Sequence, residues 1–138
     1  MMSILRIQDL NLSINGTSIL EDVSIEISPG EVCGIIGESG SGKSLTAFSV
    51  MQLLPDDATS RGTIELDGLN VLDADEASLC AMRGKSVGMV FQEPMTALNP
   101  VQTIGQQVAE TIRIHERVTK SEALKRAAET LERCELPQ

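Results

Sequence analysis

The residues best suited to chemistry form a glycine-rich segment, Gly37–Ser44, which reads GESGSGKS. Its pattern, GxxxxGK[ST], arises by chance in about 0.5% of chains of this length and average composition. In such a loop, glycines allow successive backbone N–H groups to converge on phosphate oxygens, a lysine adds positive charge, and a serine hydroxyl can ligate Mg²⁺. The sequence therefore predicts a triphosphate site made of Gly37, Glu38, Ser39, Gly40, Ser41, Gly42, Lys43, Ser44 and Leu45.

The segments on either side of this loop are the elements that would position it. Val32–Ile36 is a short apolar run, typical of a strand buried on both faces. Residues 43–54 carry apolar side chains at helical spacing, and Pro55 ends the pattern. The expected order is strand, loop and helix, so the helix N-terminus would add its partial positive charge at the phosphates.

Alternating apolar residues before and after this unit predict strands that pair side by side. They occupy residues 5–14 and 23–27, with a turn at Asn15-Gly16 between them and another at Pro29-Gly30. A further short strand at residues 64–66 leads into an Asp-Gly turn. We expect these strands to form an antiparallel layer.

The second half of the sequence alternates a helix, a strand and two more helices. Residues 73–82 predict a helix, residues 87–91 a second buried strand, and the prolines of QEPMTALNP exclude regular structure after it. Capping-box pairs predict the starts of the last two helices, the second of which runs to about Cys134. These pairs are Thr103 with Gln106 and Thr119 with Glu122.

Composition narrows the classes of function. Hydrophobic residues make up 41% of the 138, the formal charge is −9, and the aromatic residues are two Phe. A nucleic-acid surface needs clustered basic residues or stacking aromatics, so we expect no nucleic-acid partner. The three separated cysteines predict free thiols. Neither a signal peptide nor a membrane span is predicted, so any service to a membrane would come from the cytoplasmic side through a partner.

Three longer segments carry a resemblance to a known family. They are ILEDVSIEISPGEVCGIIGESGSGKSLT at residues 19–46, GTIELDG at residues 62–68 and VGMVFQEPMTALNP at residues 87–100. The sequence resembles the N-terminal half of an ATP-binding cassette (ABC) transporter ATPase, of the oligopeptide and dipeptide importer branch. The resemblance spans essentially the whole chain and is most diagnostic in the third segment.

The resemblance implies roles for two residues outside the loop. Gln92 follows the second predicted buried strand and would be the Q-loop residue, which touches Mg²⁺ together with Ser44 and takes part in catalysis with Lys43. Position supports this independently, because the carboxyl ends of parallel strands form ligand sites in open α/β sheets. The position that usually carries an aromatic residue against adenine falls at or near Ile14. An aliphatic contact there predicts weaker or less base-selective nucleotide binding.

The resemblance also implies cofactors, partners and location. The cofactors would be ATP and Mg²⁺. The partners would be membrane-spanning permease subunits, a second ABC ATPase subunit in a homo- or heterodimer and, indirectly, a solute-binding protein. The place would be the cytoplasmic face of the cell membrane, bound peripherally.

The family's LSGGQ-type signature, its second acidic motif and its switch histidine are not found in the sequence. His115 is expected to be an exposed helix residue. We therefore expect the 138 residues alone to lack hydrolytic competence, and the isolated chain to be marginally stable with an exposed sheet edge. The alternatives are a nucleotide-binding fragment that never hydrolyses ATP and, less favoured by the acidic charge, a DNA-associated ABC-type ATPase.

The fold class predicted is α/β: a P-loop NTPase core with an antiparallel β layer and the start of a helical subdomain, together an incomplete nucleotide-binding domain. The β layer and P-loop core would cover about residues 1–92, and the Q-loop and helical subdomain about residues 92–138.

Overall fold

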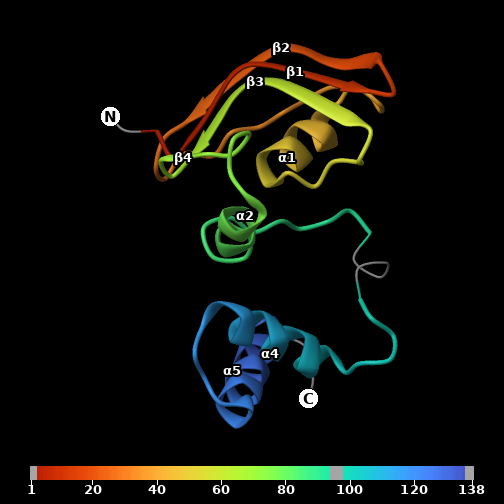
Figure 1. Cartoon of the computed structure of the whole chain (residues 1–138). Coiled ribbons are helices and arrows are strands. Elements are labelled where there is room, and N and C mark those ends of the chain that lie inside the picture. The colour runs from red at the N-terminus through yellow and green to blue at the C-terminus, as the bar shows by residue number, and fades with distance from the viewer. Residues whose placement is uncertain (1–2, 94–97, 136–138) are drawn as a thin grey trace. The chain divides into compact units, whose positions relative to one another are not determined.

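A computed structural model describes residues 3–93 and 98–135 of the chain. It contains two compact units, residues 1–83 and 84–138. Among the described residues, the first holds a sheet and two helices, and the second holds a pair of helices (Figure 1). The predicted domain boundary near residue 92 stays a prediction.

The sheet of the first unit contains four antiparallel strands in the order β2-β1-β3-β4. Asn15 and Gly16 form the turn between β1 and β2 with φ angles of 51° and 77°, which suits a hairpin and confirms the predicted turn. The predicted antiparallel layer is therefore present. Its strands are β1 (Leu5–Ile14), β2 (Thr17–Ile27), β3 (Ala58–Leu66) and β4 (Leu69–Asn70).

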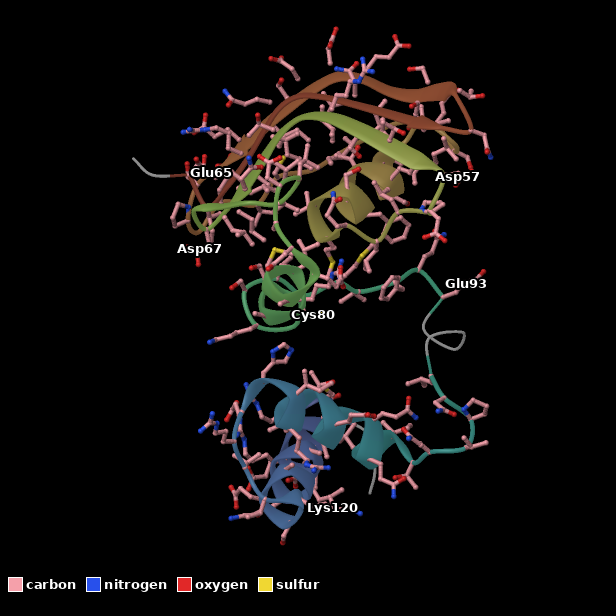
Figure 2. The ribbon with its side chains drawn as sticks, in the orientation of Figure 1. Asp57, Glu65, Asp67, Cys80, Glu93 and Lys120 are labelled. Atoms are coloured by element: carbon pink, nitrogen blue, oxygen red, sulfur yellow. The ribbon has the colours of Figure 1, made fainter. Side chains whose placement is uncertain are left out.

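An irregularity in β1 changes the register of the sheet at its middle. The pairing of β1 with β3 shifts between Gln8 and Asn11. The Asn11 side chain donates to the Asp9 carbonyl at 2.9 Å and to Asp22 Oδ1 at 3.0 Å, which ties the irregularities of β1 and β2 together. Bulges of this kind bend and twist a sheet. The strands curve over α1 in Figure 1, and Figure 2 shows Asp57 and Glu65 at opposite ends of β3.

Helices α1 (Lys43–Met51) and α2 (Glu76–Met82) complete the first unit. Helix α1 lies against the concave side of the sheet (Figure 1) and buries Thr46, Ser49, Val50 and Met51. Apolar side chains of sheet and helices share one core, because neither element can bury its apolar face alone. The largest fully buried side chains in this unit are Leu10, Leu12, Ile64 and Val71, together with Ser49.

Both helices are shorter than the sequence predicted. Helix α1 ends at Met51, because Gln52 adopts a left-handed conformation with φ of 50° and closes the helix three residues before Pro55. Helix α2 begins after Asp75, whose side chain accepts from the Ser78 N–H at 2.9 Å and so caps the helix.

In the described part of the second unit, the helices are α4 (Ile104–His115) and α5 (Lys120–Arg133). Thr103 and Gln106 form the predicted capping box of α4. The Thr119 side chain accepts from the Glu122 N–H at 3.2 Å, as predicted for the start of α5. Small residues let the two helices approach closely. Their buried core is Ala109, Ala123 and Ala127, with Val108, Ile112 and Val118 packed around it.

The two predicted buried strands are not strands in the structure. Residues 32–36 form no ladder, and Val32 and Ile36 are 96% and 99% exposed. Residues 88–91 likewise form no ladder, and Val90 is exposed. A strand needs a hydrogen-bonded neighbour, and no described segment provides one for either run. The predicted parallel pair is therefore wrong for the described residues, although both runs have the composition of buried strands.

Candidate phosphate site

The loop before α1 ends at a glycine whose backbone conformation starts the helix without a side-chain cap. Gly42 is the N-cap residue with φ of +87°, and no side chain caps the first turn. Gly40 also has a positive φ, +80°. Only glycine adopts such angles without strain. The first N–H groups of α1 therefore keep their capacity to bind an anion.

The Lys43 ammonium lies within the loop that precedes it. Its Nζ donates hydrogen bonds to the Gly37 carbonyl at 2.8 Å, the Glu38 carbonyl at 2.6 Å and Ser41 Oγ at 3.2 Å. The loop is further closed by the Ser41 N–H, which donates to the Glu38 carbonyl at 3.2 Å. The positive charge is thus held close to the main chain of residues 37–41.

Close contacts restrict two glycines of the loop, and Gly42 is restricted by its positive φ as well. A Cβ atom at Gly37 would lie 2.6 Å from Ser41 Oγ. A Cβ atom at Gly42 would collide with Leu20 Cδ2 of β2. The second contact fixes the start of α1 against the sheet, because Leu20 is itself buried.

The remaining predicted loop residues lie at the start of α1. Ser44 is exposed and is the second residue of the helix, while Leu45 is half-buried. Thr46, which the sequence analysis did not single out, donates through its N–H and its hydroxyl to the Gly42 carbonyl at 2.9 and 3.1 Å. Uncapped N–H groups, a nearby ammonium and an exposed hydroxyl together can hold a phosphate group and a coordinated cation.

Comparison with known proteins identifies the family. The sequence model of the ABC transporter family matches residues 20–138. A relative from Escherichia coli strain K12, described as a probable D,D-dipeptide transport ATP-binding protein, is 46% identical over 97% of this chain. An oligopeptide transport ATP-binding protein of Mycobacterium tuberculosis is 47% identical over 80% of this chain. The chain belongs to the ABC transporter family.

Solved ABC structures share the fold. The structure matches the dimeric ATP-binding cassette MJ0796, bound to ADP and Pi in a post-hydrolysis state, with a TM-score of 0.82 and 28% identity over 97% of this chain. It also matches cbiO1 of Clostridium perfringens, part of the transporter complex cbiONQ, with a TM-score of 0.70. The predicted fold class, an incomplete ABC ATPase domain with an antiparallel layer and helices, is confirmed.

This ABC chain spans less than half of the curated relatives it matches. It covers 43% of the Escherichia coli relative, 18% of the Mycobacterium tuberculosis relative and 58% of the MJ0796 chain. Among the described residues, no helix is long and apolar enough to span a membrane.

The two ABC site residues predicted outside the loop lie in different units. Ile14 is half-buried at the end of β1 in the same unit as the loop, and it pairs with Thr17 and Ala58. Gln92 lies in the second unit, exposed and outside any helix or strand. Residues 94–97, the middle of the QEPMTALNP segment that begins at Gln92, lie outside the described residues.

Two features of the ABC chain escaped sequence reasoning. Leu20 braces Gly42, and Arg83 donates to main-chain carbonyls at the end of α1. No local sequence pattern predicts either contact, because each contact joins residues separated by 20 or more positions. His115 is the last residue of α4, as a helix residue was predicted, but it is half-buried with its ring beside Gly84.

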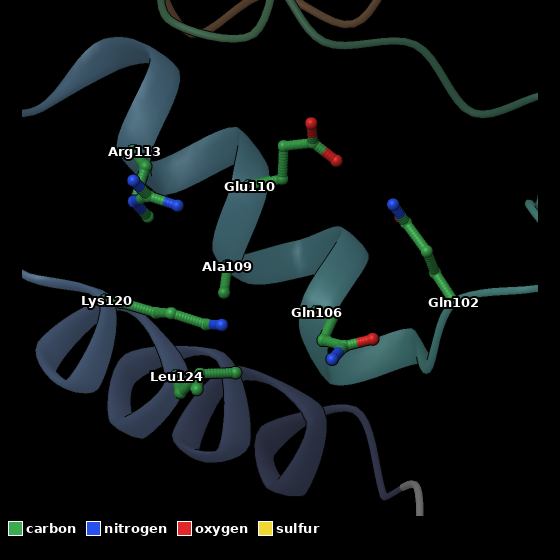
Figure 3. Close-up of a pocket in the computed structure, with 7 residues that line it drawn as sticks. All are labelled: Gln102, Gln106, Ala109, Glu110, Arg113, Lys120 and Leu124. Carbon is green, nitrogen blue, oxygen red and sulfur yellow. The ribbon is translucent and has the colours of Figure 1, made fainter.

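The second unit contains a polar hollow of about 260 Å³ between α4 and α5 (Figure 3). Its lining includes Arg113, Lys120 and Glu110 but no residue of the phosphate loop. On the same pair of helices, Arg126 donates to both carboxylate oxygens of Glu116 at 2.6 and 2.9 Å. These hydrogen bonds lower the pKa of Glu116 and raise that of Arg126. The fork ties the start of the loop between the helices to α5.

Proposed function

We propose that this chain is the ATP-binding part of an ABC importer ATPase that drives uptake of peptides or similar small solutes. The observation that carries the proposal is the placement of the Lys43 ammonium inside the loop of residues 37–41 at an uncapped helix N-terminus. The family match, and the relatives described as dipeptide and oligopeptide transport ATP-binding proteins, support the substrate class.

The loop residues take defined roles in this proposal. The N–H groups of residues 38–45 surround the β- and γ-phosphates, and Lys43 exchanges main-chain acceptors for phosphate oxygens. The Ser44 hydroxyl and the Gln92 side chain ligate Mg²⁺, which neutralises phosphate charge when it is bound. Gln92 also reports the γ-phosphate to the membrane-spanning partner. Ile14 lies against adenine.

The same proposal includes partners and place. Permease subunits, a second ABC ATPase subunit and, indirectly, a solute-binding protein complete the transporter at the cytoplasmic face of the membrane. We also propose that the 138 residues alone bind ATP without hydrolysing it, since we assign no carboxylate among them as the base that activates water. A DNA-associated role is disfavoured by the acidic charge of −9.

Calorimetric titration of the full 138-residue chain with Mg-ATP tests the binding site. Lys43→Ala should weaken binding by roughly tenfold to a hundredfold, because a charge-assisted hydrogen bond contributes about 1.5–3 kcal/mol. Lys125→Ala is the matched control, since Lys125 is exposed on α5 in the other unit. Equal affinity in wild type and Lys43→Ala contradicts the proposed site. Phosphate release measured in the same samples separates binding from turnover: release lost in Lys43→Ala contradicts the proposal of binding alone.

A further inference from the structure

Arg83 links the two helices of the first unit through one guanidinium group. Its Nε donates to the Met51 carbonyl at 2.8 Å and its Nη2 to the Gln52 carbonyl at 3.0 Å. Its Nη1 donates to Glu76 Oε1 at 2.7 Å. Each nitrogen thus has its own acceptor, and the Arg83 side chain is only 20% exposed. The group binds the C-terminal end of α1 from 32 residues further along the sequence.

The chemistry of a helix end explains this contact. The last carbonyls of a helix have no partner within the helix and carry partial negative charge, so a cation there is favourable. The planar guanidinium holds several acceptors in a fixed geometry that a lysine does not reproduce. Glu76 orients the group from α2, and the hydrogen bond from Arg83 lowers the pKa of Glu76.

The opposite end of α1 is the phosphate site. Helix α1 has nine residues, Lys43 is its first and Ser44 its second. A helix of this length is a stiff rod of about 13 Å, so a group that fixes its last turn also fixes the direction of its first. The contact of Gly42 with Leu20 braces the near end, and Arg83 braces the far end.

We propose that Arg83 is a positioning residue for nucleotide binding: it holds the C-terminal end of α1 so that the helix N-terminus, Lys43 and Ser44 keep the arrangement that phosphates require. The inference rests on the proposed function and extends it to a residue at the far end of the helix. Arg83 acts through α1 and makes no contact with the nucleotide in this proposal.

Titration of the full chain with Mg-ATP tests this inference with three variants. Arg83→Met removes the three donor nitrogens of the guanidinium and keeps an unbranched apolar side chain. Arg83→Lys keeps the positive charge but loses the planar set of donors. Arg126→Met is the matched control, because it removes an arginine of similar pairing in the other unit. Each variant is measured well below its unfolding midpoint, and both Kd and binding stoichiometry are recorded.

We expect Arg83→Met to raise the Kd for ATP about tenfold at unchanged stoichiometry, which corresponds to about 1.4 kcal/mol. Arg83→Lys should fall between wild type and Arg83→Met, and Arg126→Met should stay within about twofold of wild type. A merely structural role predicts the reverse: fewer binding-competent molecules with an unchanged Kd. That result overturns the inference. If Arg83→Met does not fold, Arg83→Lys decides, and a wild-type Kd in that variant overturns the inference.

Failure of the inference is distinguishable from failure of the proposed function. If the Kd for ATP rises in Lys43→Ala but not in Arg83→Met, the inference about Arg83 is wrong and the proposed phosphate site is supported. Absence of ATP binding in wild type contradicts the proposed function, and amide hydrogen exchange of residues 42–46 then decides on Arg83. Faster exchange there in Arg83→Met, but not in Arg126→Met, supports the inference. Unchanged exchange overturns it.

Discussion

At the scale of single residues, the phosphate loop depends on positions where a side chain would collide. Gly42 combines a positive φ with contact to the buried Leu20, so both backbone and packing demand glycine. At Gly34, eight positions earlier, an added Cβ atom would meet no atom within 4 Å, and its φ lies outside the left-handed region. Gly42 belongs to the phosphate-loop motif and Gly34 does not, and of the two only Gly42 is constrained by contact and by a positive φ.

Gly42→Ala should therefore lower the free energy of unfolding by about 1–3 kcal/mol and weaken ATP binding, because the substitution strains the N-cap and displaces Leu20. Gly34→Ala should change the unfolding free energy by less than about 0.5 kcal/mol. Urea unfolding followed by circular dichroism measures both. Equal effects of the two substitutions would show that Gly42 has no special role.

A second residue-scale prediction concerns the base. Ile14→Tyr should strengthen ATP binding by roughly fivefold to a hundredfold, since stacking on a base contributes about 1–3 kcal/mol. The gain should be larger for ATP than for a triphosphate without a base, which the phosphate loop alone holds. Titration of wild type and Ile14→Tyr with ATP, GTP and inorganic triphosphate measures this. Strong adenine preference in the wild type would contradict the prediction that Ile14 makes nucleotide binding less base-selective.

At the scale of elements, helix ends determine how the pieces are held. Helix α1 is anchored at its last carbonyls by Arg83, whereas α4 and α5 start at threonine caps and are joined by the Glu116–Arg126 fork. The fork makes the helix pair sensitive to acid. Since the pKa of Glu116 is lowered in the folded unit, its contribution is present above the ordinary value of 4.5 and is lost as the pH falls through the lowered pKa.

Glu116→Gln should therefore reduce the stability of the helix pair at neutral pH and flatten its dependence on pH below about 4.5. Thermal unfolding of the full chain between pH 7 and 3, followed by helical circular dichroism, measures this. Glu132→Gln provides the control, since Glu132 is an exposed acid of α5 outside the fork. Identical pH profiles for the two variants would argue against a contribution from the fork.

At the scale of the whole molecule, exposed apolar side chains are expected to favour association between chains. Val32 and Ile36 are almost fully exposed on a segment without a strand partner among the described residues. Isolated apolar side chains are common on surfaces, but an apolar segment with unpaired N–H and C=O groups favours association.

The double substitution Val32→Thr with Ile36→Thr should reduce association of the 138-residue chain without lowering its unfolding midpoint, because neither side chain is buried. Light scattering as a function of concentration measures association, and a thermal melt measures stability. Ile64→Thr is the contrasting variant. It should lower the free energy of unfolding by about 2–4 kcal/mol, since Ile64 is fully buried in the sheet. A monomeric wild type with a cooperative melt would contradict the expectation of association.

The sequence by itself determined the local features. The GESGSGKS loop, the Asn15-Gly16 turn and the threonine caps of α4 and α5 each depend on backbone angles and hydrogen bonds within a few residues. Alternation likewise located β1 and the C-terminal parts of β2 and β3, because the period of two reflects which face of each strand is buried.

Tertiary structure decided everything that depends on a distant neighbour. Composition predicted buried strands at residues 32–36 and 87–91, but a strand also needs a partner, and no described strand pairs with residues 32–36 or 88–91. The brace of Gly42 by Leu20 and the hold of Arg83 on α1 could not be read from any motif, because they join residues 20 or more positions apart. Adjacent residues determine local backbone geometry, whereas the position of a helix depends on the side chains that the fold brings to its two ends.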